Sequence, residues 1–121
     1  MPWREPVAAE LAERFCAALK KQGGRAPTRC RVFVNDEIIT VVAEETLNST
    51  ELRVQHTDSE AVSRSRRAIQ RMVRLNFTPQ LEALLDTNVV ASTSGHAIDP
   101  DVGIYNFVLS TRPAQDPLRD D

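Results

Sequence analysis

The sequence predicts an α+β fold, an antiparallel sheet of two hairpins with helices packed on it, in the element order αββααββ. Three observations predict it. Apolar residues recur at helical spacing near the N-terminus, two stretches alternate with the period of strands, and two polar capping patterns between them start helices. The chain has 121 residues, of which 41% are hydrophobic and 26% charged, the size and composition of one globular domain.

The first element is a helix over residues 6–21. Pro6 suits a first helical turn, and Gly23-Gly24 ends the helix because glycine readily adopts the left-handed conformation of a C-terminal cap. The apolar face repeats every four positions through Val7, Leu11, Phe15 and Leu19. We expect this face to lie against the core.

A hairpin follows in residues 29–43. Apolar residues alternate along its first strand, and its second strand, residues 38–43, is largely apolar on both faces. Asn35 and Asp36 tolerate the positive φ of a tight turn, so this pair is expected to join the two strands.

Two helices are predicted next. The segments NSTE (residues 48–51) and TDSE (57–60) have the capping-box pattern, in which a short polar side chain caps a helix and a glutamate reaches back to the cap. The first helix is short, and the second runs through SRSRRAIQRMVR. Because Pro79 lacks an amide hydrogen, we expect a break around residues 76–78 and a last helical piece from Pro79 to Asp86.

The remaining strands, TNVVASTS and VGIYNFVLS, form a second hairpin across the turn-rich segment GHAIDPD. Both alternating sets of the last strand are apolar, so we expect both faces of the sheet to be covered. Helices are few, so a second subunit is a candidate cover, and we hypothesise a homodimer. The domain is expected to span residues 1–111, and residues 112–121 are expected to be a disordered acidic tail.

Charge is unevenly spread along the chain. The net charge is -2, whereas residues 57–76 carry five arginines and two acids, a local charge of +3. At ~100° per residue, one side of the predicted helix gathers Val62, Ile69, Met72, Val73 and Asn76. The opposite side carries a row of Arg64, Arg67, Arg71 and Arg74. Arg66 lies at the edge of the apolar side, where its stem can extend along the hydrophobic surface.

This arginine row has three possible roles. Its guanidinium groups can be a solvated or salt-bridged face, a surface for a protein partner, or a site for phosphates, which arginine binds as a bidentate fork. The net charge of -2 and the low aromatic content, 5%, make nucleic-acid binding the weakest of these.

Candidates for chemistry are few. His96, Asp99 and Asp101 fall in one predicted loop and are weak candidates for a metal or small-molecule site, although Asp-Pro-Asp is also a common turn. Cys16 and Cys30 fit no zinc spacing and are expected to be buried thiols. We expect no cofactor and no enzymatic activity. Without a signal-peptide pattern or an apolar run of ~20 residues, a cytoplasmic location is expected.

The order and spacing of several segments resemble the MpsC family. These segments are GGRAP, VFVNDEII, LNSTE, FTPQLEALLDTNVVAS and DPDVGIYNFVL, and the resemblance covers about residues 7–110. It implies a small accessory or regulatory component of a bacterial Na+-translocating, membrane-potential-generating system, and it carries over no catalytic residues. One departure is that Ala43-Glu44-Glu45-Thr46 occupies a turn where the family tends to carry glycine, with an apparent extra residue.

Three functions follow from these observations. The leading one is a non-enzymatic accessory or regulatory protein that acts through protein contacts and has a possible partner at a membrane transport system. The first alternative is phosphate or nucleic-acid binding through the arginine row. The second is a small-molecule or metal-sensing domain centred on His96, Asp99 and Asp101.

Overall fold

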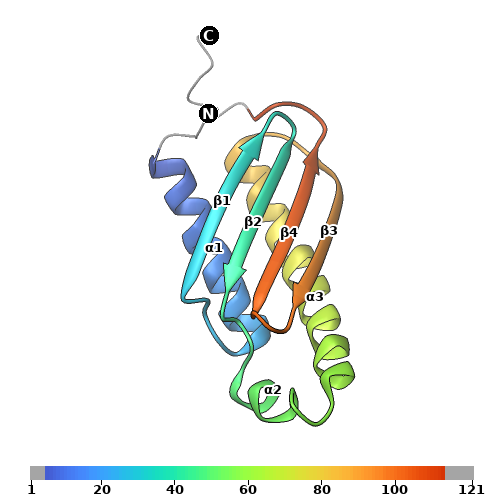
Figure 1. The fold of residues 1–121 in the computed structure, drawn as a ribbon. Coiled ribbons are helices and arrows are strands. Elements are labelled where there is room, and N and C mark those ends of the chain that lie inside the picture. Colours follow the sequence, from blue (N-terminus) through green and yellow to red (C-terminus); the bar gives the residue numbers. More distant parts are fainter. Residues whose placement is uncertain (1–4, 114–121) are drawn as a thin grey trace.

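The computed structural model describes residues 5–113. Within them the chain folds as the predicted α+β domain in the order αββααββ (Figure 1). The elements are α1 (Glu5–Gly23), β1 (Arg29–Asn35), β2 (Ile38–Glu44), α2 (Ser49–Val54), α3 (Ser59–Leu85), β3 (Val89–Ala97) and β4 (Val102–Leu109).

The four strands form one antiparallel sheet in the order β1-β2-β4-β3, so the two hairpins join through their second strands. In the first hairpin Asn35 pairs with Ile38, which leaves Asp36 and Glu37 as the two-residue turn. The turn is therefore one residue later than predicted. Asp36 has a φ of 53°, the left-handed conformation that Asp tolerates in such turns.

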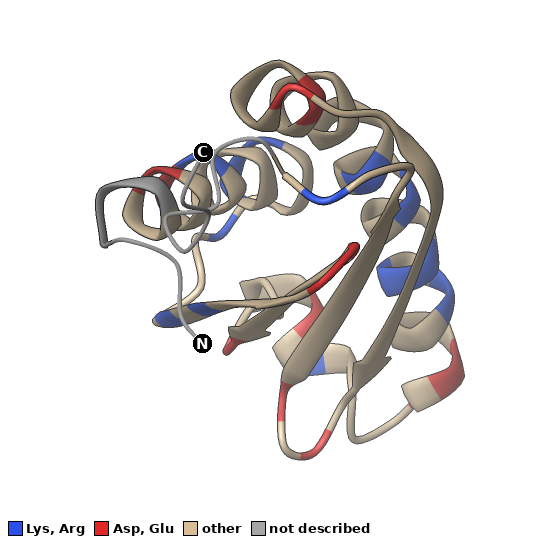
Figure 2. Ribbon diagram, turned by 90° about the horizontal axis from the view of Figure 1, so that it is seen from above, with Lys and Arg blue, Asp and Glu red and all other residues tan. Residues whose placement is uncertain are grey.

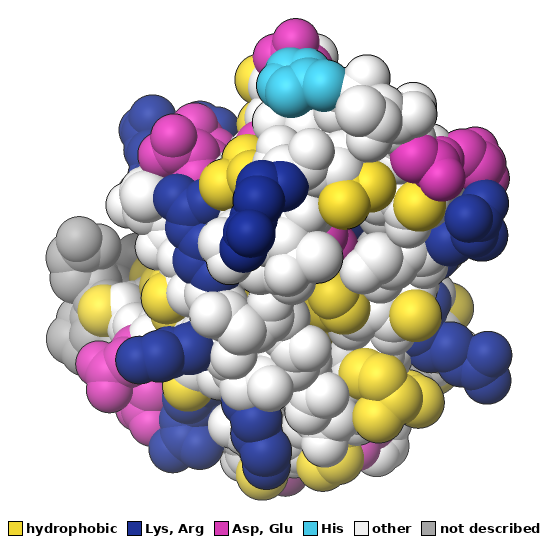
Figure 3. Space-filling model, turned by 90° about the horizontal axis from the view of Figure 1, so that it is seen from below, with side chains coloured by type: hydrophobic (Ala, Val, Ile, Leu, Met, Phe, Trp, Pro, Cys, Tyr) yellow, Lys and Arg dark blue, Asp and Glu magenta, His cyan; other side chains and the backbone are white. Residues whose placement is uncertain are grey.

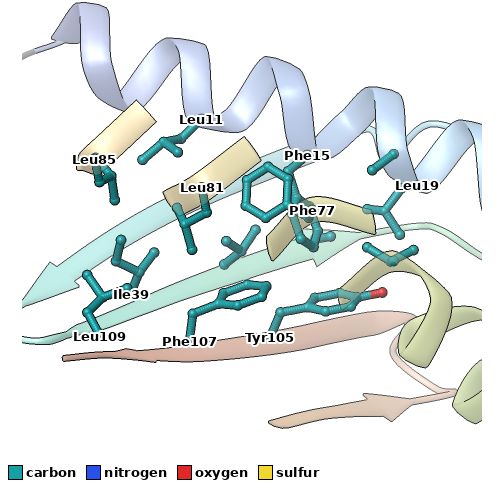
Figure 4. Packing of buried hydrophobic residues seen from close by; sticks show 14 residues of the cluster. Leu11, Phe15, Leu19, Ile39, Phe77, Leu81, Leu85, Tyr105, Phe107 and Leu109 are labelled. Carbon is teal, nitrogen blue, oxygen red and sulfur yellow. The ribbon is translucent and has the colours of Figure 1, made fainter. Parts of the chain in front are cut away.

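The core lies between the sheet and the two long helices. Leu11, Phe15 and Leu19 of α1 point onto the sheet, where they meet inward side chains of β2 and β4 (Figure 4). The Phe15 ring centroid lies 5.0 Å from that of Phe77 and 4.6 Å from that of Tyr105, both edge-on. This edge-to-face packing of rings contributes beyond area burial alone and fixes the two helices over the sheet.

The predicted break in the long helix is wrong, because α3 continues through Pro79 to Leu85. Pro79 cannot donate to the carbonyl of Leu75, and Leu75 is 60% exposed, so water can satisfy that oxygen. One residue earlier, the hydroxyl of Thr78 donates to the carbonyl of Arg74 over 2.7 Å. The proline therefore falls on the wet side of the helix, where a missing amide hydrogen costs little.

The first predicted capping box is present and the second is not. The Asn48 side chain accepts from the Glu51 amide over 2.9 Å, and the Glu51 carboxylate accepts from the Asn48 amide over 3.0 Å. At the start of α3 the cap is Asp58, which accepts from the Ala61 amide over 3.0 Å. Asp58, the residue after Thr57, is therefore the N-terminal cap of α3 in place of the predicted Thr57.

Both α1 and α3 lie on the same face of the sheet (Figures 1 and 2). Within the described chain the helices therefore cover one face, and the expected cover of the other face by a second subunit stays a prediction. Three large apolar side chains remain on the other face: Phe33 is 49%, Ile38 41% and Ile104 43% exposed. The apolar character of both faces of the strands was read correctly, but residues 5–113 supply a cover for only one.

The predicted tail begins inside the described residues and continues beyond them. Arg112 donates to Asp36 over 2.8 Å, an exposed contact beside the β1–β2 turn. Residues 114–121 of the predicted acidic tail lie outside the described part of the chain.

Candidate functional site

The arginine row of α3 is only partly free. Arg64 and Arg67 are exposed and both approach Glu60, at 3.8 and 3.6 Å. Arg71 is exposed and has no ion pair within residues 5–113. Basic positions recur along the ribbon of α3 (Figure 2), and at the end of the molecule seen in Figure 3 several basic side chains lie beside acidic ones.

Arg74 does not belong to the solvent-facing row. It is half-buried, and one guanidinium nitrogen donates to both the carbonyl and the hydroxyl of Ser92, over 3.0 and 3.1 Å. Because Ser92 lies on β3, Arg74 ties the long helix to the edge strand of the sheet. The predicted row of four is thus a row of three.

Arg66, predicted at the edge of the apolar side, is instead buried, with 1% of its surface exposed. Its guanidinium donates to both carboxylate oxygens of Glu51, over 3.0 Å from Nε and 2.7 Å from Nη2. A third nitrogen donates to the hydroxyl of Thr46 over 3.3 Å. A bidentate pair of this kind has good geometry for an arginine removed from water.

The buried side of α3 is rotated from the predicted one. Met72 is 46% exposed and Asn76 is also exposed, so neither belongs to the core. The core-facing positions are Val62, Arg66, Gln70, Val73, Phe77, Leu81 and Leu85. Arg66 and Gln70 are polar residues at buried positions of the helical repeat. A prediction from the apolar residues alone therefore placed the buried side of α3 too far toward Met72 and Asn76.

Glu51, Arg66, Thr46 and Ser65 form a largely buried polar cluster, in which Glu51 connects α2 to α3. Besides Arg66, its carboxylate accepts from the Asn48 amide and from the Ser65 hydroxyl, over 3.0 and 2.8 Å. Burial alone would raise the pKa of Glu51, but hydrogen bonds from Arg66, Asn48 and Ser65 outweigh it and hold the pKa below its usual value. Glu51 is therefore ionised at neutral pH and fixes α2 against α3.

His96 and Asp101 come together as the sequence suggested, but Asp99 is exposed and does not join them. The His96 side chain is 4% exposed, with Nε2 2.8 Å from Asp101 Oδ1. Asp101 also accepts from the Leu47 amide over 2.9 Å. Burial lowers the pKa of His96, and the nearby Asp101 carboxylate only partly offsets this. His96 is thus neutral at pH 7. It lies beside Asp101, which in turn holds the 45–48 turn through the Leu47 amide.

The three weak metal candidates do not form a metal site in the structure. Across residues 5–113 no three His, Cys, Asp or Glu side chains converge in a way that can hold a metal ion. Cys16 on α1 and Cys30 on β1 are free and only partly buried. Burial raises the pKa of both thiols, that of Cys30 to about 12, so neither is a reactive thiolate at neutral pH.

A pocket of about 240 Å³ lies between α3 and β3 beside the polar cluster. Arg66 and Gln70 line it from the helix, and Ser94 and His96 line it from the strand. Gln70 donates to the carbonyl of Gly95 over 2.9 Å, which holds helix and strand together at the pocket floor. Sequence reasoning missed this pocket, although two polar residues at buried spacing, four apart on α3, were a usable signal.

None of the described helices is long and apolar enough to cross a membrane. No curated protein and no solved structure matches the chain. One family does match, described as the Na+-translocating membrane potential-generating system (MpsC), over residues 4–111. That match includes the whole sheet, the three helices and the polar cluster, and it agrees with the order of segments noted above. The chain therefore belongs to the MpsC family.

Proposed function

We propose that this chain is a non-enzymatic accessory component of a Na+-translocating membrane-potential-generating system, that it acts on the cytoplasmic side, and that it works through protein contacts. Family membership supports the link to such a system. One structural observation supports the mode of action, namely the open face of the sheet. We further propose that a second copy of the chain covers this face.

The open face carries apolar side chains beside a polar centre, where Thr40 donates to Asn106 over 2.8 Å. In the register of the sheet, Phe33 lies opposite Thr40 and Ile38 lies opposite Val108. Phe33, Ile38 and Ile104 each keep more than two fifths of their surface exposed. Large apolar side chains that stay exposed beside polar groups are a feature of protein interaction surfaces.

The same face carries charges of both signs, which suits contact with an identical face. Glu44 on β2 lies 3.8 Å from Arg29 and 3.6 Å from Arg31 on the neighbouring strand, and all three side chains are at least partly exposed. An isologous interface repeats every residue on both sides, so a face with both charges can pair them across a twofold axis. A strongly basic or strongly acidic partner would complement only the acidic Glu44 or only the basic Arg29 and Arg31.

The size of the face sets the expected strength. Four strands of seven to nine residues, about 4.8 Å apart, give a projected area of roughly 400 Å² per copy. A face-to-face pair then buries on the order of 1,000 Å² in total, at the low end of specific interfaces. We therefore expect a reversible dimer that dissociates in the micromolar range.

The experiment is sedimentation velocity of the full chain across a concentration series, repeated with substitutions on the face. Phe33→Glu and Ile104→Glu each place a charge in the proposed contact and are expected to give monomers with an unchanged circular-dichroism spectrum. Leu75→Glu is the matched control, because Leu75 is 60% exposed on α3, away from the sheet. A native chain that stays monomeric at about 100 µM, or a dimer insensitive to both face substitutions, would overturn this assignment.

The accessory role is tested in cells that carry the transport system. Deletion of the chain is expected to lower the Na+-dependent membrane potential, and the Leu75→Glu variant is expected to restore it. The Phe33→Glu/Ile104→Glu double variant is expected to fail although it is produced at the same level. Full rescue by that double variant would show that the open face has no part in the function.

A second candidate is phosphate binding by the exposed arginines, which Arg71 favours because it has no ion pair within the described residues. Glu60 shares its charge between Arg64 and Arg67, so the row is partly compensated. Fluorescence anisotropy of labelled DNA and RNA across a salt series tests it. Binding that weakens steeply with salt and with Arg67→Ala and Arg71→Ala would support this candidate over the first.

A further inference from the structure

The pocket between α3 and β3 has the size of a small ligand. At about 240 Å³ it holds roughly eight water molecules, just below the ~300 Å³ at which most ligand pockets begin. It is lined on one side by a single face of α3 and on the other by the edge strand β3 and the turn that follows. Its polar lining residues are Ser63, Arg66, Arg67, Gln70, Ser94 and His96.

The polar floor of this pocket is not explained by core packing. Along the buried side of α3 the positions before and after it are apolar, Val62 and Val73, whereas Arg66 and Gln70 are 1% and 2% exposed. Burying a guanidinium and an amide costs free energy that an apolar side chain of similar size avoids. Both costly residues of the helix line the pocket, which favours a role there over a role in stability.

The floor is also held rigidly. Both oxygens of Glu51 fix the Arg66 guanidinium, and Gln70 is fixed by its bond to the carbonyl of Gly95. The His96 ring is buried, with Nε2 against Asp101, and its Nδ1 lies 3.1 Å from the point where a Cβ on Gly103 would sit. Arg66 and Gln70, each already held by a partner, need little reorganisation when a ligand enters.

Arg67 gives the lining its positive charge, because Glu51 already pairs with the second guanidinium, that of Arg66. No carboxylate is among the lining residues in the described chain, since Glu51 and Asp101 contact Arg66 and His96 from outside the pocket. Arg67 is two-thirds exposed, and its pair with Glu60 at 3.6 Å is exposed as well. Such a surface pair is weak, so an anion in the pocket can displace it.

Hydroxyl groups complete the set of donors. Ser63 lies one helical turn from Arg67, and Ser94 faces them from β3. Ile98 and the His96 ring give the remaining wall apolar surface beside these polar groups. Arginine and serine donors at the mouth of a partly apolar pocket are the groups that recognise an oxyanion attached to a small carbon skeleton.

We propose that this pocket binds a small organic anion through a carboxylate or a phosphate group, with Arg67, Ser63 and Ser94 as the donors. Arg66 is a positioning residue. It shapes the pocket floor through its bonds to Glu51 and Thr46 and does not itself contact the ligand. The site lies on the helical side of the molecule, away from the open face of the sheet. Its occupancy is therefore independent of the dimer proposed above.

The test is a ¹H–¹⁵N correlation spectrum of the full chain, titrated separately with sodium phosphate and sodium acetate, with sodium chloride at matched ionic strength as the blank. Saturable shifts are expected in residues 63–70 and 94–98 with at least one of the two anions. The preferred anion separates a phosphate site from a carboxylate site. Arg67→Gln is expected to weaken that binding about tenfold or more, because it removes a charged hydrogen bond.

Arg71→Gln is the matched control, since Arg71 lies one turn further along α3, is exposed and does not line the pocket. It is expected to change the affinity by less than twofold, while Ser94→Ala is expected to weaken it several-fold. Three results would each overturn the proposal: no saturable shift with either anion, shifts spread over all exposed arginines, or equal losses for Arg67→Gln and Arg71→Gln. Unchanged spectra elsewhere in each variant exclude misfolding as the cause.

Discussion

Two ion pairs of this chain have the same length and opposite surroundings. Arg66 and Glu51 lie 2.7 Å apart with side chains 1% and 6% exposed, while Arg14 and Glu10 lie 2.7 Å apart with side chains 44% and 45% exposed. We predict that Glu51→Gln lowers the free energy of unfolding by about 3–5 kcal/mol, because it leaves the Arg66 charge buried without a counter-charge. Glu10→Gln is expected to cost less than about 1 kcal/mol, since water screens the exposed pair.

The measurement is urea unfolding at pH 7, followed by circular dichroism at 222 nm. Thermal melts of the same variants give a second readout: for a domain of this length about 4 °C of melting temperature corresponds to 1 kcal/mol, so Glu51→Gln is expected to melt roughly 12–20 °C lower. In the double variant Glu51→Gln/Arg66→Met both charges are gone, and its loss is expected to be smaller than the sum of the two single losses. Equal costs for Glu51→Gln and Glu10→Gln would refute the reasoning that burial gives the pair its importance.

The pH dependence of the same pair has a defined direction. The pKa of Glu51 is lower in the folded protein than in the unfolded chain, so the unfolded state takes up a proton first as pH falls. The stabilisation is therefore fully present above the unfolded pKa of ~4.3 and is lost as pH falls through the folded value. The Glu51→Gln variant is expected to lack this part of the acid transition, as midpoints measured between pH 6 and pH 3 would reveal.

Three further predictions concern single positions. Asp86→Gly is expected to raise the unfolding free energy by about 1 kcal/mol, because Asp86 ends α3 with a φ of 52° and a negative charge at the helix C-terminus; an unchanged or lower urea midpoint would contradict it. Gly103→Ala is expected to lower the free energy of unfolding by about 1–3 kcal/mol, because the added methyl meets His96 Nδ1 at 3.1 Å. The control Gly95→Ala places a methyl with nothing within 4 Å and is expected to cost under about 0.5 kcal/mol in the same melts. Burial lowers the pKa of His96, so the unfolded chain binds that proton at higher pH and stability should fall as pH drops below ~6.5; a His96→Asn chain with the same slope between pH 7 and 5 would assign the effect elsewhere.

Local patterns predicted most of the fold. The alternation in β1, the helical spacing of Leu11, Phe15 and Leu19, and the Asn48 capping box each depend on neighbours a few residues away, and each is present. Pro79 was misjudged for the same reason: its local preference is against helix, but packing of Phe77 and Leu81 on either side keeps the helix intact. Tertiary burial outweighs one missing hydrogen bond.

The candidate site depended on information that no local pattern carries. Arg66 looked like an edge residue because its partner Glu51 lies 15 positions earlier, across a turn and on another helix. His96 and Asp101 come together as hypothesised, but His96 lies in strand β3 and not in the predicted loop, and the sequence could not show that it turns inward while Asp99 stays exposed. The turn in which the family tends to carry glycine contains Glu45, whose φ is 59°. Glycine adopts this left-handed conformation at lower cost, which accounts for the family's preference.

The strand order β1-β2-β4-β3 also has a consequence for how the chain folds. Each hairpin pairs strands that are neighbours in sequence and can form in microseconds, as can the helices α2 and α3 between the hairpins. The β2–β4 pairing instead joins residues far apart in sequence, such as Thr40 and Asn106, whose side chains meet over 2.8 Å across 66 positions. Closing that long loop is the entropically expensive step, so we expect it to set the folding rate. Substitutions at the β2–β4 seam should then slow folding, while those at the outer edges should mainly speed unfolding.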